Sequence, residues 1–166
     1  MTPVIVVMGV SGSGKTTVGA ALAGRLSVEF ADADDFHPAA NIAKMSAGQP
    51  LDEEDRRPWL EAIARWMGAH RTTGGVVSCS ALRHRYRDVL RGGAPDAVFL
   101  HLAGSPDVVA RRVAGRPAHF MPVALVRSQF ETLEPLSADE RGVAQPLDLP
   151  VDRIAAQFLD WLGRQT

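Results

Sequence analysis

A glycine-rich loop near the start of the chain carries the clearest chemical signal. The apolar run Val4–Met8 ends at Gly9, and Gly14-Lys15-Thr16 follows after four intervening residues. This is the phosphate-binding pattern G-x-x-x-x-G-K-[ST], with a strand before it and a helix behind it. Glycines let the loop curl so that its N–H groups face an anion, and the helix dipole adds positive potential. The sequence therefore predicts a triphosphate site.

Two side chains of this loop have chemical roles of their own. Lys15 can reach the β- and γ-phosphates, and the Thr16 hydroxyl can ligate Mg²⁺. The alternative is a glycine-rich turn with a chance lysine, which the agreement of motif, position and flanking strand disfavours. We assign nucleotide binding to the loop and the start of its helix: Gly9, Ser11, Gly12, Ser13, Gly14, Lys15, Thr16 and Thr17.

Acidic residues follow the second short apolar segment, which we expect to form a strand near 28–31. Ligands of parallel sheets bind beyond the carboxyl ends of the strands, so these carboxylates should face the phosphate loop. Strand alternation would place Asp32 and Asp34 on one face and Asp35 on the other. We predict that Asp34 accepts the proton of the phosphoryl acceptor and that Asp32 supports Mg²⁺. The alternative is a solvated turn with an aspartate cap.

Several basic side chains are candidates for holding the acceptor. His37 could hydrogen-bond a polar substrate, and Arg56 could hold an acidic group with two parallel hydrogen bonds. Arg83 and Arg87 are four apart and would share a helical face, as a substrate clamp requires. The alternatives are a loop-stabilising histidine, solvated arginines and a basic surface helix.

A break at Gly115 predicts a lid over approximately 112–125. Arg112 and Arg116 flank the break and could neutralise the charge that develops in phosphoryl transfer, while closure would exclude water. The alternative for both is ordinary surface charge. Cys79 is interpreted as a buried residue, since phosphoryl transfer by positioning needs no covalent intermediate.

The elements that must position these residues alternate between apolar runs and helical patterns. This alternation predicts an α/β fold in which helices cover a parallel sheet. The expected strands are 4–8, 28–31, 76–79, 97–102 and one within 142–149. A broken segment is expected over 39–48, and Asp55 is expected to cap a helix that has Pro58 in its first turn. Further helices are expected over 15–26, 81–90, from Ser105-Pro106 onward, 123–133 and 151–162.

Length and charge restrict the class of protein. The chain has 166 residues, which predicts a single domain spanning 1–166, and a net charge of −1, which gives no pull toward nucleic acid or anionic membranes. A single cysteine excludes an internal disulfide. The first apolar run is too short for a signal peptide or a membrane span. We expect a cytoplasmic protein with neither nucleic-acid nor membrane partners.

Three blocks of the sequence resemble the small gluconate kinase family. They are Asp32-Ala-Asp34-Asp35-Phe-His37-Pro38 with its continuation to Arg56, Cys79-Ser-Ala-Leu-Arg83 with Tyr86-Arg87, and His119-Phe-Met-Pro122 with Ser128-Gln129-Phe-Glu-Thr-Leu-Glu134. The resemblance covers nearly the whole chain. One departure is Arg116-Pro-Ala-His119, where the family more often has a small flexible pair with glycine before the histidine.

The resemblance implies a three-layer, adenylate-kinase-like phosphate-loop fold with a central five-stranded parallel sheet. It implies transfer of the ATP γ-phosphate to the 6-hydroxyl of D-gluconate, with Mg²⁺, by a homodimer. Similarity to the related shikimate kinases implies that Asp34 meets the acceptor hydroxyl and that Arg56 grips the acceptor carboxylate. The third block adds His119 and Gln129 to the substrate-binding residues.

Two other functions stay open at this point. One is another small-metabolite kinase, of the shikimate or nucleoside monophosphate type, against which the 34–38 and 128–134 segments argue. The other is a non-catalytic nucleotide-binding regulator, which the gathering of polar residues at one crevice disfavours.

Overall fold

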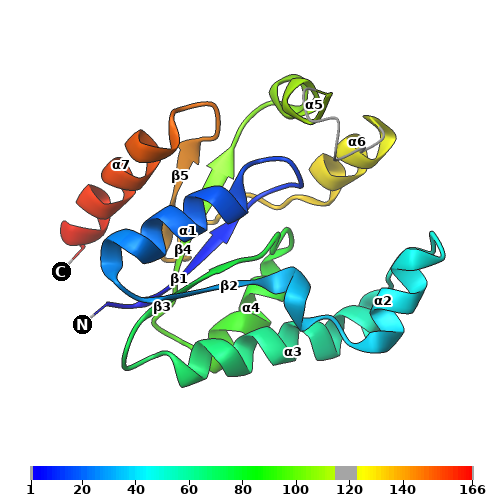
Figure 1. Ribbon diagram of the computed structural model, residues 1–166, viewed down its shortest axis with the longest axis horizontal. Coiled ribbons are helices and arrows are strands. Elements are labelled where there is room, and N and C mark those ends of the chain that lie inside the picture. The colour runs from blue at the N-terminus through cyan, green and yellow to red at the C-terminus, as the bar shows by residue number, and fades with distance from the viewer. Residues whose placement is uncertain (1, 115–122, 166) are drawn as a thin grey trace.

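A parallel sheet forms the centre of the fold. In a computed structural model of the chain, which describes residues 2–114 and 123–165, the sheet has five strands in the order β2-β3-β1-β4-β5 (Figure 1). Their bounds are β1 Val4–Met8, β2 Glu29–Asp32, β3 Gly75–Ser78, β4 Val98–Ala103 and β5 Gly142–Pro146. The predicted five-stranded parallel sheet is confirmed, and each strand lies within about one residue of its expected place.

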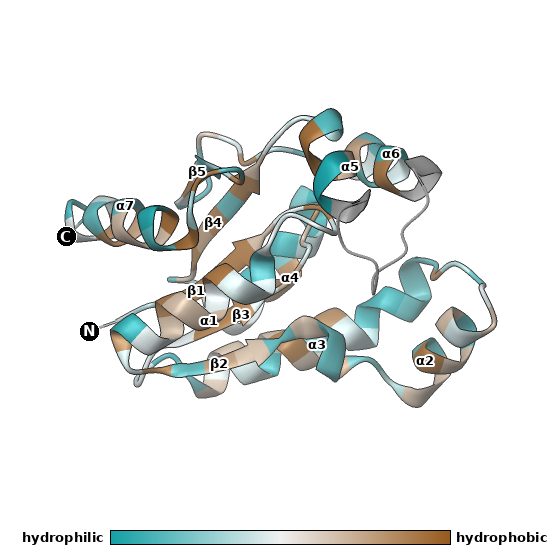
Figure 2. Cartoon of the chain, turned by 45° about the horizontal axis from the view of Figure 1, so that its top comes forward, coloured by the Kyte–Doolittle hydropathy of each residue, from teal (hydrophilic) through white to brown (hydrophobic). Residues whose placement is uncertain are grey.

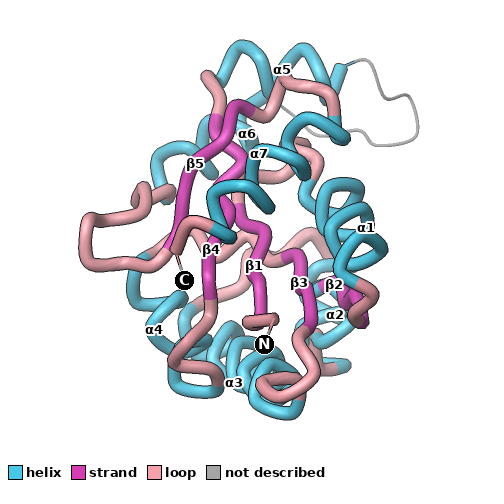
Figure 3. Tube along the Cα trace, turned by 90° about the vertical axis from the view of Figure 1, so that its left-hand side faces the viewer, coloured by secondary structure: helices cyan, strands magenta, loops and turns pink. Residues whose placement is uncertain are grey.

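The central strand is apolar throughout because helices cover both of its faces. All five residues of β1 are buried, as in parallel sheets whose strands read as continuous apolar runs. Val6 pairs in register with Val77 of β3 and with Phe99 of β4. The carboxyl ends of β1 and β3 are therefore adjacent, and α5 and α6 lie beyond this edge in Figure 3.

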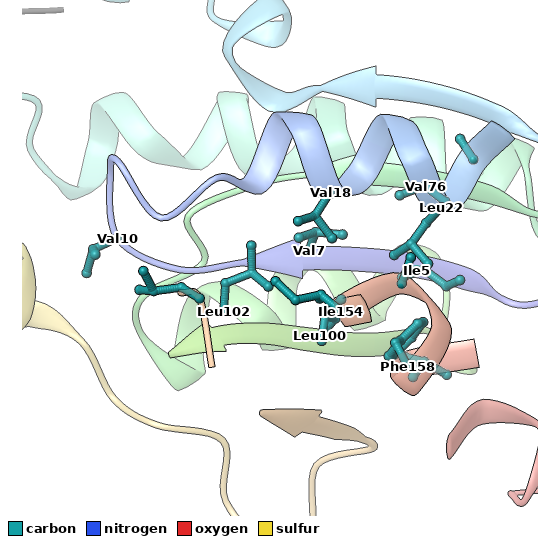
Figure 4. Close-up of a cluster of buried hydrophobic side chains, with 14 of the residues drawn as sticks. Ile5, Val7, Val10, Val18, Leu22, Val76, Leu100, Leu102, Ile154 and Phe158 are labelled. Carbon is teal, nitrogen blue, oxygen red and sulfur yellow. The ribbon is translucent and has the colours of Figure 1, made fainter. Parts of the chain in front are cut away.

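Two layers of helices enclose the sheet. On one face α1 (Lys15–Leu26) and α7 (Val151–Gly163) bury Val18, Leu22, Ile154 and Phe158 against Val7 and Leu100 (Figure 4). On the other face α3 (Glu53–Ala69) and α4 (His84–Gly93) build a second apolar cluster with β1 and β3. No helix among the described residues is long and apolar enough to cross a membrane.

The segment expected to be broken is a helix, α2 (Ala39–Ser46). Pro38 precedes it, and the fixed φ of proline favours a helix start. In Figure 2 the helix projects from one end of the molecule. Its apolar side chains Ile42 and Met45 are exposed. The helix therefore lacks the buried apolar stripe by which the other helices can be predicted from the sequence.

Helix α3 begins three residues earlier than expected. Asp52 is its N-cap, and its carboxylate accepts a hydrogen bond from the Asp55 N–H at 2.8 Å, while the Asp55 carboxylate accepts one from the Asp52 N–H at 2.9 Å. This reciprocal capping box fixes the start, so the prediction that Asp55 is the cap was wrong. Pro58 consequently lies in the second turn and not in the first.

The remaining elements complete the site's surroundings. Helix α4 starts at His84, not at Ala81, because Ala81 has φ 45°, which a right-handed helix cannot contain. Helix α5 (Pro106–Ala114) begins where predicted, with the Ser105 hydroxyl accepting from the Val108 N–H at 3.3 Å. Helix α6 spans Val123–Thr132, and a short 3₁₀ helix, η1, spans Ala33–Phe36.

Candidate active site

The phosphate loop connects β1 to α1 and has the backbone that its glycines permit. A side chain at Gly9 would meet the Ser13 hydroxyl at 2.8 Å and the Leu102 carbonyl at 3.0 Å, so only glycine fits there. Gly14 caps α1 with φ 92° and no side-chain cap is found in the described structure. The first-turn N–H groups of α1 are therefore available to an anion.

The loop lysine points back over its own loop. Lys15 Nζ donates to the Val10 carbonyl at 3.0 Å. Burial lowers the pKa of Lys15, and the nearby Cys79, Asp34 and Asp32 oppose that shift. Burial also raises the pKa of Cys79 to about 12, so this thiol is neutral at pH 7 and the two aspartates supply the negative charge facing Lys15.

The two aspartates reach the loop by a different geometry from the one predicted. Strand β2 ends at Asp32, and Asp34 lies on η1, so the strand alternation invoked for them was wrong. Asp32 caps η1: its Oδ1 accepts from the Asp34 N–H at 2.9 Å, and its Oδ2 accepts from the Thr16 hydroxyl at 3.1 Å. Both carboxylates nevertheless line one cavity with Lys15, whereas Asp35 does not line it.

Asp34 has the electrostatics of a proton acceptor. Burial raises its pKa first, and the neighbouring Asp32 raises it further, while His37 and Lys15 act in the opposite direction. A carboxylate with a raised pKa holds a proton better than an ordinary one, as a general base requires.

The cavity that gathers these residues has a volume of about 940 Å³. That is near the upper end for small-molecule sites, which leaves room for a triphosphate beside a small acceptor. A shallower hollow of about 390 Å³ lies between α3 and α4 and is lined by Ala64, Gly68 and Gly93 among others. It contains none of the predicted site residues, so we place the site in the larger cavity.

A histidine and a tryptophan that stack on each other form part of the cavity lining. The His37 ring stacks on Trp59 with centroids 4.5 Å apart and planes within 6°. The Asn41 amide nitrogen can only donate, so His37 Nδ1 accepts from it at 3.3 Å and the neutral ring carries its proton on Nε2. Burial lowers the pKa of His37, against the pull of Asp34. His37 therefore offers a neutral N–H donor near pH 7.

A group of hydrogen-bonded side chains beside the cavity is centred on Glu53. Its carboxylate accepts from the Tyr86 hydroxyl at 2.6 Å, from Arg85 at 2.9 Å and from Arg56 at 3.3 Å. Arg56 and Tyr86 line the cavity, and the Arg56 guanidinium carbon lies 5.6 Å from the centre of the Tyr86 ring. Arg56 is thus held in place with donors to spare for an acidic acceptor. Sequence reasoning missed Glu53 and Trp59 because their roles depend on partners from other elements.

The predicted clamp of Arg83 and Arg87 is not formed. Arg83 is the residue before α4 and does not line the cavity. Arg87 is 0 % exposed and donates to both carboxylate oxygens of Glu140, at 2.7 and 2.9 Å. Because α4 starts later than expected, Arg83 lies outside the helix and the two arginines do not share a helical face. Arg87 is buried and its guanidinium binds Glu140. Nothing in the sequence around Glu140 indicated this partner.

The residues after β4 approach the phosphate loop. Gln129 of α6 lines the cavity, and its side-chain oxygen accepts from the Ser11 N–H at 2.6 Å. Arg112 donates to the Leu147 carbonyl at 2.5 Å, and its other terminal nitrogen would lie 3.3 Å from a side chain on Gly14. Arg116 and His119, with the middle of the expected lid, lie outside the described residues.

Thr16 and Asp32 present two oxygen atoms that could hold Mg²⁺. Mg²⁺ keeps several waters and is held by one or two protein oxygens together with substrate phosphates. The contact between the Thr16 hydroxyl and the Asp32 carboxylate provides such a pair beside the phosphate loop. Within residues 2–114 and 123–165 no cluster of three or more histidine, cysteine or acidic side chains could hold a metal by itself.

Comparison with known proteins finds a matching family model and close relatives in sequence. The family model described as shikimate kinase matches residues 11–145. The chain is 49% identical to the thermosensitive gluconokinase of Escherichia coli (strain K12), covering 84% of this chain and 76% of that one. It is 41% identical to the thermoresistant gluconokinase of the same strain, covering 95% and 91%.

Solved structures add the fold. A crystal structure of a gluconokinase from Sinorhizobium meliloti 1021 superimposes with a TM-score of 0.90 at 45% identity, covering 98% of this chain and 93% of that one. The shikimate kinase of Aquifex aeolicus superimposes with a TM-score of 0.64 at 14% identity, covering 97% and 96%. The second similarity concerns the fold alone.

Proposed function

The chain belongs to the gluconokinase family, within the wider shikimate kinase family, and we propose that it transfers the γ-phosphoryl group of ATP to the 6-hydroxyl of D-gluconate. The products are 6-phospho-D-gluconate and ADP. One observation carries the proposal: the phosphate loop, the carboxylate of Asp34 and the acceptor-side arginine Arg56 line the same cavity. This also agrees with the family resemblance read from the sequence.

The nucleotide half of the site has one role, which is to hold the triphosphate and offset its charge. The loop N–H groups and Lys15 would bind the β- and γ-phosphates. Arg112, beside Gly14, would add positive charge at the same phosphates. We keep Arg116 as a sequence-based proposal for the same role.

The acceptor half of the site orients the hydroxyl for in-line attack. The oxygen of the 6-hydroxyl forms a bond to the γ-phosphorus while the bond from that phosphorus to the ADP oxygen breaks. Asp34 would take the proton of the hydroxyl. Arg56 would hold the gluconate carboxylate, with His37 donating from Nε2 to a sugar hydroxyl. Gln129 and His119 are proposed as further acceptor contacts on the basis of the resemblance.

We propose that Mg²⁺ is bound with ATP, held by Thr16 with support from Asp32. The ion would neutralise charge on the transferring phosphate. The protein's own contribution is to keep these two oxygens together, as their 3.1 Å contact does.

Three further proposals complete the functional assignment. Residues 1–166 would form one domain with a lid over approximately 112–125, the protein would act in the cytoplasm where ATP is available, and it would form a homodimer. The resemblance to the gluconate kinases supports the first and the last of these. Light scattering coupled to gel filtration tests the homodimer, which predicts twice the chain mass of 17.8 kDa.

A coupled assay of ADP release tests the function. We expect ADP release that depends on D-gluconate, and much slower release with shikimate or a nucleoside monophosphate. Lys15→Ala provides the matched inactive control. Equal turnover with another acceptor would favour a different small-metabolite kinase. Nucleotide binding without acceptor-dependent turnover would favour the regulator, which the family assignment does not support.

A further inference from the structure

A buried ion pair outside the cavity, Arg87 with Glu140, contacts the cavity wall. The wall in question is the segment 79–82, which follows β3 and lines the cavity between the phosphate loop and the acceptor side. The Ser80 carbonyl accepts from the Gly9 N–H at 3.3 Å, and the Cys79 N–H donates to the Val7 carbonyl at 3.0 Å. A shift of this segment would therefore also displace Gly9, the first glycine of the phosphate loop.

The wall contains a backbone conformation that its sequence does not favour. Ala81 has φ 45°, in the left-handed region that glycine adopts readily and alanine does not. Among the described non-glycine residues only Ser27 shares a positive φ, and Ser27 merely caps the end of α1. Residues held in such conformations need surrounding contacts to keep them there.

Arg87 supplies a side-chain contact of this kind at Ala81 itself. Its Nη1 donates to the Ala81 carbonyl at 2.7 Å, which fixes the orientation of the peptide plane after Ala81. The guanidinium is fully buried, and its other two nitrogens, Nε and Nη2, donate to the Glu140 carboxylate. Arg91 donates to the same carboxylate at 2.8 Å but makes no hydrogen bond to the wall.

We propose that Arg87, oriented by Glu140, is a positioning residue that holds the wall 79–82 in the shape that accepts substrate. Arg87 touches no substrate in this scheme and acts only through Ala81. The consequence for catalysis rests on the proposed function, because the acceptor binds against this wall. The effect of Arg87 on the conformation of the wall 79–82 does not depend on the proposed function.

Arg87→Lys tests the proposal and Arg91→Lys is its matched control. Lysine preserves the charge beside Glu140, but one ammonium cannot serve both carboxylate oxygens and the Ala81 carbonyl as the planar fork does. We expect Arg87→Lys to raise KM for D-gluconate about tenfold or more, the equivalent of one charge-assisted hydrogen bond, with a smaller change in kcat. Arg91→Lys should lower stability without raising this KM.

A second readout does not depend on the reaction. Cys79 is the only cysteine, lies in the wall and is 1 % exposed, so its labelling by a thiol reagent reports local opening. After correction for global stability by urea unfolding, Arg87→Lys should label faster than Arg91→Lys. If the parent protein shows no gluconate-dependent ADP release, the proposed function fails while this readout still tests the wall.

Ala81→Gly provides the rescue. Because glycine adopts a φ of 45° without help, adding Ala81→Gly to Arg87→Lys should restore most of the slow labelling and most of the low KM. Equal labelling in the two lysine variants, or strictly additive effects of Arg87→Lys and Ala81→Gly, would overturn the proposal. Should Arg87→Lys fail to fold, Glu140→Gln keeps the arginine with a weaker partner. It should show a smaller increase in labelling that glycine at 81 reverses, and unchanged labelling would equally overturn the proposal.

Discussion

Replacing Glu140 by glutamine should remove a specific part of the stability at neutral pH, and the loss should shrink in acid. Burial of Glu140 would by itself raise the carboxyl pKa, but hydrogen bonds from Arg87, Arg91 and the Ser137 N–H outweigh it and lower the pKa to about 2 from an ordinary 4.5. At about 1.36 kcal/mol per unit, this difference corresponds to about 3 kcal/mol. The side chain is 1 % exposed, so solvent screening reduces this value little.

The sign of the pH dependence follows from the direction of the shift. A carboxyl whose pKa is lower in the folded state stabilises the protein fully above the unfolded value, near 4.5, and the stabilisation disappears as the pH falls through about 2. Glutamine resembles the protonated carboxyl at every pH. The variant should therefore be about 3 kcal/mol less stable than the parent at pH 7, and the gap should narrow by about 1 kcal/mol at pH 3.5.

Urea unfolding of both proteins between pH 7 and pH 3.5 measures this gap. Glu61→Gln, an exposed carboxylate of α3, is a control that should leave the curve unchanged. His84 Nε2 lies 3.8 Å from Glu140, so His84→Gln in both backgrounds separates any contribution from this ring. A gap that stays constant over the pH range would refute the reasoning, because a purely structural loss does not titrate.

Three catalytic predictions concern the reacting groups themselves. Asp34→Asn should lower kcat by about 10²–10⁴-fold and leave ATP affinity unchanged, as measured by steady-state kinetics and nucleotide titration; equal loss of ATP affinity would move Asp34 to a nucleotide role. Lys15→Ala should lower kcat/KM by at least about 10²–10³-fold, and near-normal phosphorylation would count heavily against the assignment. Asp32→Asn should raise the Mg²⁺ concentration for half-maximal rate by about tenfold or more, and an unchanged Mg²⁺ requirement would remove Asp32 from the metal site.

The phosphate loop could be predicted from sequence because its chemistry is local. The signal consists of glycines, a lysine and a threonine at fixed spacing, and one contact of the loop, from Lys15 Nζ to the Val10 carbonyl, joins residues close together in the sequence. The central strand was equally clear, since a run buried on both faces is continuously apolar. These elements need little information from the rest of the chain.

The acceptor side could be predicted only in part because its geometry depends on distant partners. Asp32 and Asp34 were predicted to face the phosphate loop, and both line the cavity with Lys15. The turn that places Asp34, however, is held by a hydrogen bond from the Trp59 indole to the Ala33 carbonyl at 2.7 Å, across 26 positions. Arg87 was expected to bind substrate because an exposed arginine and a buried one look alike in sequence. Its partner Glu140 is 53 positions away.

The difference between local and distant contacts also indicates which residues determine substrate specificity in this fold. The shikimate kinase of Aquifex aeolicus has the same fold at 14% identity, so the sheet and its order tolerate almost complete replacement of the sequence. Kinases of one fold that use different acceptors must differ where the acceptor binds. In the site proposed for this chain, that part of the cavity is supported by the hydrogen bonds from Tyr86 to Glu53 and from Arg87 to the Ala81 carbonyl. Neither Glu53 nor Arg87 lines the cavity. Substitutions that change the accepted substrate should therefore be found among such supporting residues as well as among those that face the ligand.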